Sequence, residues 1–298
     1  MRRRTFLTAL ATAATTSFAL AGCSSADATA SAGTSGGVTI GSANFSESQL
    51  VAEIYAQKLE KAGVKVTRKF NIGSRETYIP ALKDGSIDLI PDYQGALLTY
   101  LDPAVGHVSA SALTATLTSK LPKSLTMLKA SPAQDVNVLA VRKETAEKYG
   151  LTTISSLAPH AADLSEGSAP EWKTRYEGVV GLKKIYGITF KSFVPLDSAG
   201  PLTLAALKSG RIDVGPLTST DPALKSLTVL EDDKGLFLPQ NIAPLVRTSA
   251  DSTKIDTALN AVSARLTTND LIDMNDKVGN KHQSVATVAK AWLQASGL

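Results

Sequence analysis

Short apolar runs alternate with amphipathic stretches along the chain from Val38 onward. Apolar residues at helical spacing predict a helix that starts at Ser46, where Gln49 completes a capping-box pattern, and that ends at Gly63. Alternating or wholly apolar runs predict strands in the first half of the chain at residues 38–40, 64–70 and 87–90. This alternation is typical of α/β layers in which helices cover a mostly parallel sheet.

The second half of the chain repeats the alternation. Strands are predicted at residues 136–141, 190–194, 212–214 and 241–246, and helices at 144–149, 182–186 and 253–266. One segment also occurs twice, since residues 81–88 read ALKDGSID and residues 206–213 read ALKSGRID. Glycine commonly ends a helix in unrelated proteins as well. The conformational preference of glycine therefore explains the match as well as an internal duplication does.

Two related halves predict a two-lobed α/β protein with a ligand cleft between the lobes. We expect lobe I to comprise residues 38–136 plus 222–298, because the chain returns to the first sheet near its end. Lobe II is expected to comprise residues 137–221.

The amino terminus has the layout of an export signal over residues 1–22: three arginines at positions 2–4, then an uncharged run and small residues. Its large apolar residues are too few for a spanning helix, so we expect cleavage. Arg3-Arg4-Thr5-Phe6-Leu7 resembles the twin-arginine export pattern, which leaves that route and the general secretory route both open.

The segment Leu20-Ala21-Gly22-Cys23 resembles the lipobox of bacterial lipoproteins. We therefore expect lipidation of Cys23, a flexible Ser/Ala/Gly/Thr tether over residues 23–37, and a chain anchored to the extracytoplasmic face of the cell membrane. Cys23 is the only cysteine of the chain, which excludes an intramolecular disulfide.

Composition and charge exclude several classes of protein. The chain has 298 residues, of which 43% are hydrophobic and 19% charged, so it is globular rather than disordered. The formal charge of +4 is supplied mainly by the arginines of the signal, and the other lysines are scattered. Because no basic patch remains, nucleic acid is not an expected partner.

Catalytic and metal-binding signatures are missing from the sequence. His107, His160 and His282 have no partner at metal-ligand spacing, and no nucleophile elbow or phosphate loop occurs. The chain is therefore expected to bind a solute without a metal, a cofactor or catalysis.

Several segments together resemble the substrate-binding lipoproteins of ABC importers for osmoprotectants such as glycine betaine, choline and carnitine. The resemblance lies in IGSANFSE (40–47), NIGS (71–74), ALKDGSIDLIPDYQG (81–95), LAV (139–141), PE (170–171) and STD (219–221). It implies a type II periplasmic-binding-protein fold, in which two hinge strands join the lobes beside the ligand cleft. It also implies a monomeric receptor that captures a small zwitterionic or quaternary-ammonium solute and delivers it to a membrane permease driven by an ATPase.

The resemblance also implies roles for individual residues. Tyr93 matches the tyrosine of a PEYTG-like motif, whose ring would face a methylated cation. Asp135 matches a polar residue that supports the site, and Asn137 stands where the family often has an aromatic residue. Arg175 resembles an arginine that clamps a ligand carboxylate, although a surface salt bridge is an alternative interpretation.

The chain departs from this family pattern in its aromatic residues. Leu204 and Thr218 stand where tyrosines are expected, so Trp172, Tyr176 or Tyr78 would have to replace them. The expected polar lining comprises Asn44, Ser74, Arg75, Glu76, Asn137, Thr218 and Thr220. Because the chain has fewer of the expected aromatic residues, two alternatives stay open. The same fold could bind a different solute, such as an amino acid or a thione-betaine, or the protein could be a cleft enzyme or a sensor.

Overall fold

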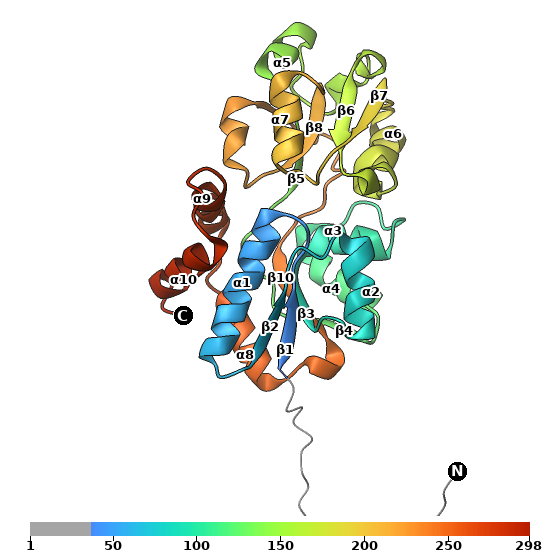
Figure 1. The fold of residues 1–298 in the computed structure, drawn as a ribbon. Helices are drawn as coiled ribbons and strands as arrows, with labels where there is room; N and C mark the ends of the chain where they lie inside the picture. Colours follow the sequence, from blue (N-terminus) through green and yellow to red (C-terminus); the bar gives the residue numbers. More distant parts are fainter. Residues whose placement is uncertain (1–36) are drawn as a thin grey trace, which may run out of the picture. The chain divides into compact units, whose positions relative to one another are not determined.

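The structure, a computed structural model, describes residues 37–298 (Figure 1). The predicted signal peptide, the lipidation of Cys23 and nearly all of the predicted tether lie outside the described residues. Residues 36–298 form one compact unit. Among residues 37–298, no helix is both long and apolar enough to cross a membrane.

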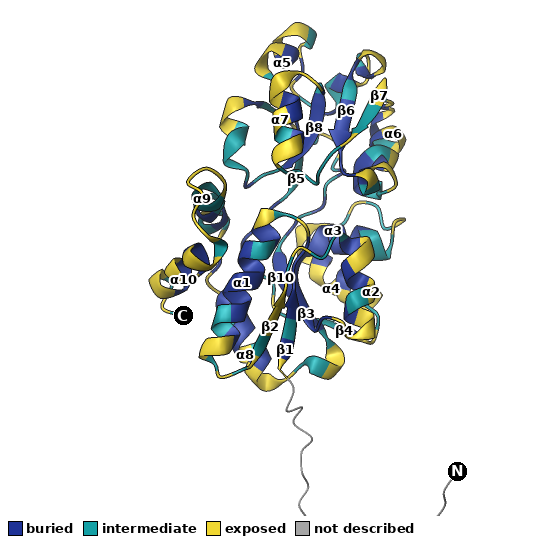
Figure 2. Ribbon diagram, viewed as in Figure 1, coloured by how far each residue is buried: buried dark blue, intermediate teal, exposed yellow. Residues whose placement is uncertain are grey.

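Lobe I contains a five-stranded sheet of order β2-β1-β3-β10-β4. Its strands are β1 (Val38–Gly41), β2 (Val66–Lys69), β3 (Leu89–Tyr93), β4 (Leu125–Met127) and β10 (Ile242–Arg247). Strands β1 and β2 are parallel, whereas β10 is antiparallel to both of its neighbours. The central strands β3 and β10 are almost wholly buried, so they form the core of the lobe (Figure 2).

Seven helices of lobe I cover this sheet. They are α1 (Ser46–Lys61), α2 (Arg75–Asp84), α3 (Gln94–Leu101), α4 (Ala110–Lys120), α8 (Thr253–Ser263), α9 (Thr268–Gly279) and α10 (Val285–Ala295). Helix α1 begins at Ser46 with Phe45 as its N-cap residue and no side-chain cap, so the predicted capping box is wrong. Apolar residues of α1, α8, α9 and α10 share one core cluster.

Lobe II contains a second sheet of order β7-β6-β8-β5-β9. Its strands are β5 (Asn137–Val141), β6 (Ser165–Ser168), β7 (Ser192–Pro195), β8 (Val214–Thr218) and β9 (Thr228–Leu230). Its helices are α5 (Lys143–Tyr149), α6 (Gly181–Tyr186) and α7 (Pro201–Ser209). Its short helical turns are η1 (Ser155–Leu157), η2 (Ala161–Asp163), η3 (Pro170–Lys173), η4 (Tyr176–Val180) and η5 (Pro222–Ser226). A further turn, η6 (Thr248–Ala250), belongs to lobe I.

The repeated segment has the same structure in both lobes. Helix α2 ends at Gly85 with φ of 83°, and helix α7 ends at Gly210 with φ of 77°. Both angles lie in the left-handed region, which glycine adopts without strain. A buried strand follows each glycine, so the predicted order of helix, glycine stop and strand is confirmed in both lobes.

In lobe I the aspartate of this segment joins three strands. Asp88 precedes β3, and its Oδ2 accepts a hydrogen bond of 2.8 Å from the backbone N–H of Thr39 in β1. Arg247, the last residue of β10, donates to Asp88 Oδ1 from its Nε at 3.1 Å.

Lobe II has the same arrangement. Asp213 precedes β8 and accepts a hydrogen bond of 2.9 Å from the backbone N–H of Ser165 in β6. Arg142, which follows β5, pairs with Asp213 at 3.4 Å. Each lobe thus uses one aspartate and one arginine to join the parallel strands to the antiparallel crossing strand.

The chain crosses twice between the lobes. The first crossing runs through Asp135, whose backbone N–H donates to the carbonyl of Gln240 in the second crossing at 3.2 Å. The second crossing occurs later than the predicted residue 222, because β9 pairs with β5 in lobe II and Leu236 packs in the lobe II core. Leu238 packs in a lobe I core, so the return lies between these two leucines.

Candidate functional site

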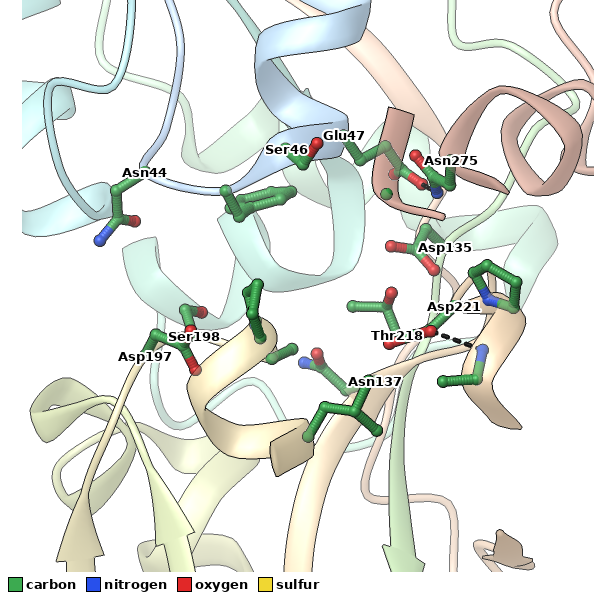
Figure 3. A pocket seen from close by; sticks show the side chains of 18 of the residues that line it. Asn44, Ser46, Glu47, Asp135, Asn137, Asp197, Ser198, Thr218, Asp221 and Asn275 are labelled. Atoms are coloured by element: carbon green, nitrogen blue, oxygen red, sulfur yellow. Dashed lines mark hydrogen bonds between the residues drawn. The ribbon is translucent and has the colours of Figure 1, made fainter. Parts of the chain in front are cut away.

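A cavity of about 800 Å³ lies where the carboxyl end of β3 and the start of α1 face the start of α7 and the end of β8 (Figure 3). Both lobes and both crossings contribute to its wall. The lining includes Phe45, Glu47, Tyr93, Asp135, Asn137, Asp197, Ser198, Leu204, Thr218, Asp221 and Asn275.

Two aromatic rings contribute to the apolar part of the wall. Tyr93 is the last residue of β3, and Phe45 lies in the turn between β1 and α1. Their ring centroids are 5.8 Å apart and the ring planes are inclined by 41°. Such a pair offers ring faces to a cation, which is attracted by the ring quadrupole.

The Glu47 side chain joins three separate parts of the protein. Its Oε1 accepts a hydrogen bond of 2.8 Å from the Tyr93 hydroxyl, and its Oε2 accepts bonds from the Thr220 hydroxyl at 2.6 Å and from Asn275 Nδ2 at 2.7 Å. Glu47 is only 5% exposed. The buried Glu47 carboxyl group is thus held against the aromatic wall by three hydrogen bonds from the protein.

Asp135 lies beside Glu47 at the first crossing. Its Oδ1 accepts hydrogen bonds from the backbone N–H of Thr220 at 2.9 Å and from the Ser219 hydroxyl at 3.3 Å. Burial, reinforced by the charge of Glu47, raises the pKa of Asp135 well above its usual range. Two buried carboxyl groups therefore share the inner end of the cavity.

Neutral polar side chains from lobe II lie opposite this acidic end. Asn137 and Thr218 are direct partners in the antiparallel pair of β5 and β8, and both line the cavity (Figure 3). Asp197 and Asp221 also line it, but their carboxylates are used locally. Asp197 accepts from two backbone N–H groups at the start of α7, and Asp221 accepts from Ala223 at 2.7 Å.

Arg75 borders the cavity but is held by a buried ion pair. Its Nη2 lies 2.6 Å from Oδ1 of Asp92, a residue with no exposed surface. Although burial alone would lower the pKa of Arg75, the carboxylate of Asp92 raises it above the usual range. Asp92 also accepts from the Tyr93 backbone N–H at 2.8 Å, so the ion pair fixes the backbone that carries the ring.

Arg175 joins the two lobes at the side of the cavity. It donates to Glu76 through Nε at 3.1 Å and through Nη2 at 2.8 Å. Burial tends to raise the pKa of Glu76, but hydrogen bonds from Arg175 and Ser74 outweigh it and lower the pKa to about 2. Arg175 therefore makes with Glu76 of the protein the bidentate pair that was expected with a ligand carboxylate.

The residues predicted from sequence fall into two groups. The cavity is lined by Asn44, Arg75, Tyr93, Asp135, Asn137, Arg175 and Thr218. The predicted lining residues Ser74, Glu76 and Thr220 do not border it. Ser74 and Glu76 are bonded to each other at 2.6 Å at the start of α2, and Thr220 is buried with its hydroxyl on Glu47.

The aromatic residues considered as replacements do not line the cavity. Trp172 is buried in the lobe II core, where its indole N–H donates to Glu166 at 2.8 Å. Tyr176 packs against the same core, and Tyr78 is buried in lobe I. Leu204 does border the cavity, at the place where a tyrosine is expected. The second ring comes instead from Phe45.

Sequence reasoning missed Phe45, Glu47, Asp197, Ser198 and Asn275. Phe45 is the N-cap residue of α1 and Glu47 lies in the first turn of that helix, and a polar residue at the start of a helix after a buried strand is a usable signal for a site. The loop at residues 197–200 precedes α7 as the loop at 71–74 precedes α2, so the repeat also pointed to it. Asn275 carried no local signal.

Metal binding finds no support in the described part of the chain. Within residues 37–298, no group of three or more His, Cys, Asp or Glu side chains is arranged to hold a metal ion. The acidic residues of the cavity instead accept hydrogen bonds from protein donors, as described above.

The ion pair of Arg175 with Glu76 leads to a prediction. Replacing Arg175 with glutamine should lower the affinities for glycine betaine and for choline by the same factor, at most about 5-fold. The arginine bridges the lobes and does not hold the solute, and a partly exposed ion pair contributes about 1 kcal/mol or less. Titration calorimetry with both solutes measures the two factors. A selective loss of glycine betaine by tenfold or more would show that Arg175 holds the ligand carboxylate.

The fold, with a cavity where its two lobes meet, is typical of one class of protein, the two-lobed solute receptors. Residues 36–295 match the family described as the substrate binding domain of ABC-type glycine betaine transport systems, and the chain belongs to this family. The predicted family, the predicted α/β fold and the predicted class of function are therefore confirmed.

Individual relatives are similar over most of the chain. An ergothioneine transport permease and binding protein of Helicobacter pylori is 30% identical over 85% of the chain, which spans only 46% of that protein. A carnitine transport binding protein of Listeria monocytogenes is 27% identical over 86% of each chain. A crystal structure described as a glycine betaine/carnitine/choline ABC transporter superposes with a TM-score of 0.66 at 27% identity, covering 87% of this chain and 98% of that one.

Proposed function

We propose that this chain is the solute-binding component of an ABC importer that captures a small methylated ammonium compound in the cavity between its lobes. The observation that carries the proposal is the juxtaposition of the Phe45 and Tyr93 rings with the buried carboxyl groups of Glu47 and Asp135. The family match of residues 36–295 supports the transport role.

The physical basis is the chemistry of a methylated cation. A quaternary ammonium donates no classical N–H hydrogen bond, so it is bound by ring faces and by nearby negative charge. Two rings and two buried carboxyl groups supply both, and Asn137 and Thr218 offer neutral polar groups for the other end of a small solute. Glycine betaine, choline, carnitine and proline betaine all carry a methylated ammonium together with a polar oxygen-containing group.

Partners and location follow from the transport role. The receptor would deliver its solute to a membrane permease driven by an ATPase. We propose that it acts as a monomer on the extracytoplasmic face, where a diacylglycerol on Cys23 anchors it to the membrane. Mass spectrometry of the purified full-length protein tests the anchor, because diacylated Cys23 adds a defined mass and its replacement by alanine removes it.

A different solute is the second candidate. Only two aromatic rings line the cavity within the described residues, and one relative is named for ergothioneine, whose chemistry includes both a methylated ammonium and a thione. This candidate keeps the receptor role and changes only the ligand.

A thermal-shift screen of residues 36–298 tests the proposal. The panel comprises betaines, choline, carnitine, ergothioneine and common amino acids. A solute at 100 times its dissociation constant should stabilise the domain by about 2.7 kcal/mol, which gives a clear rise in melting temperature. Stabilisation by methylated ammonium compounds supports the proposal, whereas stabilisation only by compounds that lack this group would contradict it.

A further inference from the structure

A second groove lies on lobe I between helices α1 and α8 and shares no residue with the solute cavity. It has a volume of about 540 Å³. Its lining consists of small, hydroxyl-bearing and basic side chains: Lys58, Ala62, Thr253, Lys254, Thr257, Ala258 and Ala261. Both charged residues of the lining are therefore lysines.

The positive charge of this groove is not offset by ion pairs. Within residues 37–298, Lys58 and Lys254 form no ion pair with a carboxylate. Glu60 is close to Lys58 in the sequence, but its carboxylate pairs with Arg68 at 2.6 Å. The lysines of the groove are thus available for an anionic partner.

Helix α8 adds to this positive charge. It begins at Thr253, which lines the groove, so the positive end of the helix dipole lies there together with Lys254. Asp251 and Asp256 are the acidic residues nearest to Lys254 in the sequence, and neither lines the groove. The structure therefore brings together charges of one sign from two helices that are far apart in the sequence.

The groove lies at the end of lobe I where the predicted tether joins the domain. Gly37 precedes β1, and the backbone N–H of Val38 donates to the carbonyl of Lys65 at 2.8 Å. Lys65 is exposed and follows Ala62 of the groove by only three positions. Figure 1 shows the start of β1 and helix α8 at the same end of lobe I, opposite to lobe II.

We infer that this groove, with Lys65 beside it, is a docking surface for the anionic headgroups of membrane phospholipids. The inference rests on the proposed anchoring of the chain to the membrane. Residues 24–36 join Cys23 to Gly37. Since an extended chain covers about 3.3–3.6 Å per residue, a lipid on Cys23 keeps this end of lobe I within about 50 Å of the bilayer.

Charge complementarity and the anchor act together at such a surface. Each lysine close to an anionic membrane strengthens binding about fivefold, so Lys58, Lys65 and Lys254 together contribute about 100-fold. This affinity is low for a free domain, but an anchor raises the effective concentration of the membrane surface. Because the groove belongs wholly to lobe I, the contact leaves lobe II free to close over the solute.

Vesicle flotation tests the inference on residues 36–298, which form one compact unit and lack Cys23. The domain should bind vesicles of equal parts phosphatidylglycerol and phosphatidylcholine about tenfold or more tightly than vesicles of phosphatidylcholine alone. Added salt should weaken this preference, because it screens exposed charges. Lys58→Gln combined with Lys254→Gln should lower binding to the anionic vesicles by about tenfold or more.

Lys143→Gln combined with Lys191→Gln is the matched control. Both lysines are exposed in lobe II, so this variant loses the same net charge away from the groove. It should change vesicle binding by less than about twofold, because charges farther than a Debye length from the membrane are screened. Solute affinity should be unchanged in both double variants, which also shows that both fold.

The outcomes separate this inference from the proposed transport role. Equal binding to the two kinds of vesicle, or equal losses in the two double variants, overturns the inference and leaves the transport role standing. A domain that floats with anionic vesicles but binds no solute contradicts the transport role and keeps the inference.

The tether of the chain itself is the alternative occupant of the groove. Residues 24–298, which include the tether without Cys23, should bind anionic vesicles as tightly as residues 36–298. If the longer fragment binds them about tenfold more weakly, the tether covers the groove and the inference is overturned.

Discussion

Tyr93→Ala is expected to lower solute affinity about 30- to 100-fold. A desolvated cation–π contact contributes about 2 kcal/mol or more, which alone corresponds to about 30-fold. The variant also removes the hydroxyl that donates to Glu47 Oε1 at 2.8 Å, so the carboxylate loses a bond that orients it. Titration calorimetry with the solute identified in the thermal-shift screen measures the change.

Tyr93→Phe separates the two contributions of this side chain. It keeps the ring against Phe45 and removes only the hydroxyl, so its loss of affinity should be no more than about tenfold, the effect of one typical hydrogen bond of about 0.5–1.5 kcal/mol. Equal affinities for Tyr93→Ala and the wild-type domain would remove the ring from the site.

Arg75→Met is expected to destabilise the domain by about 3–5 kcal/mol, because it leaves the Asp92 carboxylate buried without its positive partner. For a domain of this size, about 1 kcal/mol corresponds to a change of about 2–4 °C in melting temperature, so a loss of about 6–20 °C is expected. Chemical denaturation measures the free energy of unfolding directly. Binding should weaken as well, because Asp92 also holds the backbone of Tyr93.

Lys120→Met provides the matched control for this variant. Lys120 pairs with Asp102 at 2.8 Å, but both side chains are partly exposed, at 45% and 24%. Such a pair contributes about 1 kcal/mol or less. If Arg75→Met lowers stability no more than this control, the ion pair with Asp92 does not support the site.

Most of the fold could be predicted from local sequence patterns. The repeated segment ending in Asp88 and Asp213 predicted a matching helix and strand in each lobe, because glycine stops and short buried strands are local features. The second crossing was placed too early, because β9 is only three residues long and gives little periodic signal. Its place in the lobe II sheet depends on its pairing with β5.

The site could be predicted only in part. Tyr93 and Asp135 were predicted from the family resemblance, because Tyr93 matches the tyrosine of a PEYTG-like motif and Asp135 matches a polar residue that supports the site. Arg175 was interpreted as a ligand clamp, but its partner Glu76 is 99 residues away in the sequence, and no local pattern reveals that contact. Thr220 was expected in the lining, but its hydroxyl donates to Glu47, which is 173 residues away in the sequence. No local pattern reveals that contact either.

The measurement that tests the central claim most directly is calorimetric titration of residues 36–298 with the tightest methylated ammonium compound of the screen, in parallel for the wild type and Tyr93→Ala. We expect one solute bound per chain at micromolar or lower dissociation constant in the wild type, and a loss of about 30- to 100-fold in the variant. The account is contradicted if no such compound binds, or if binding of one per chain is unchanged in Tyr93→Ala.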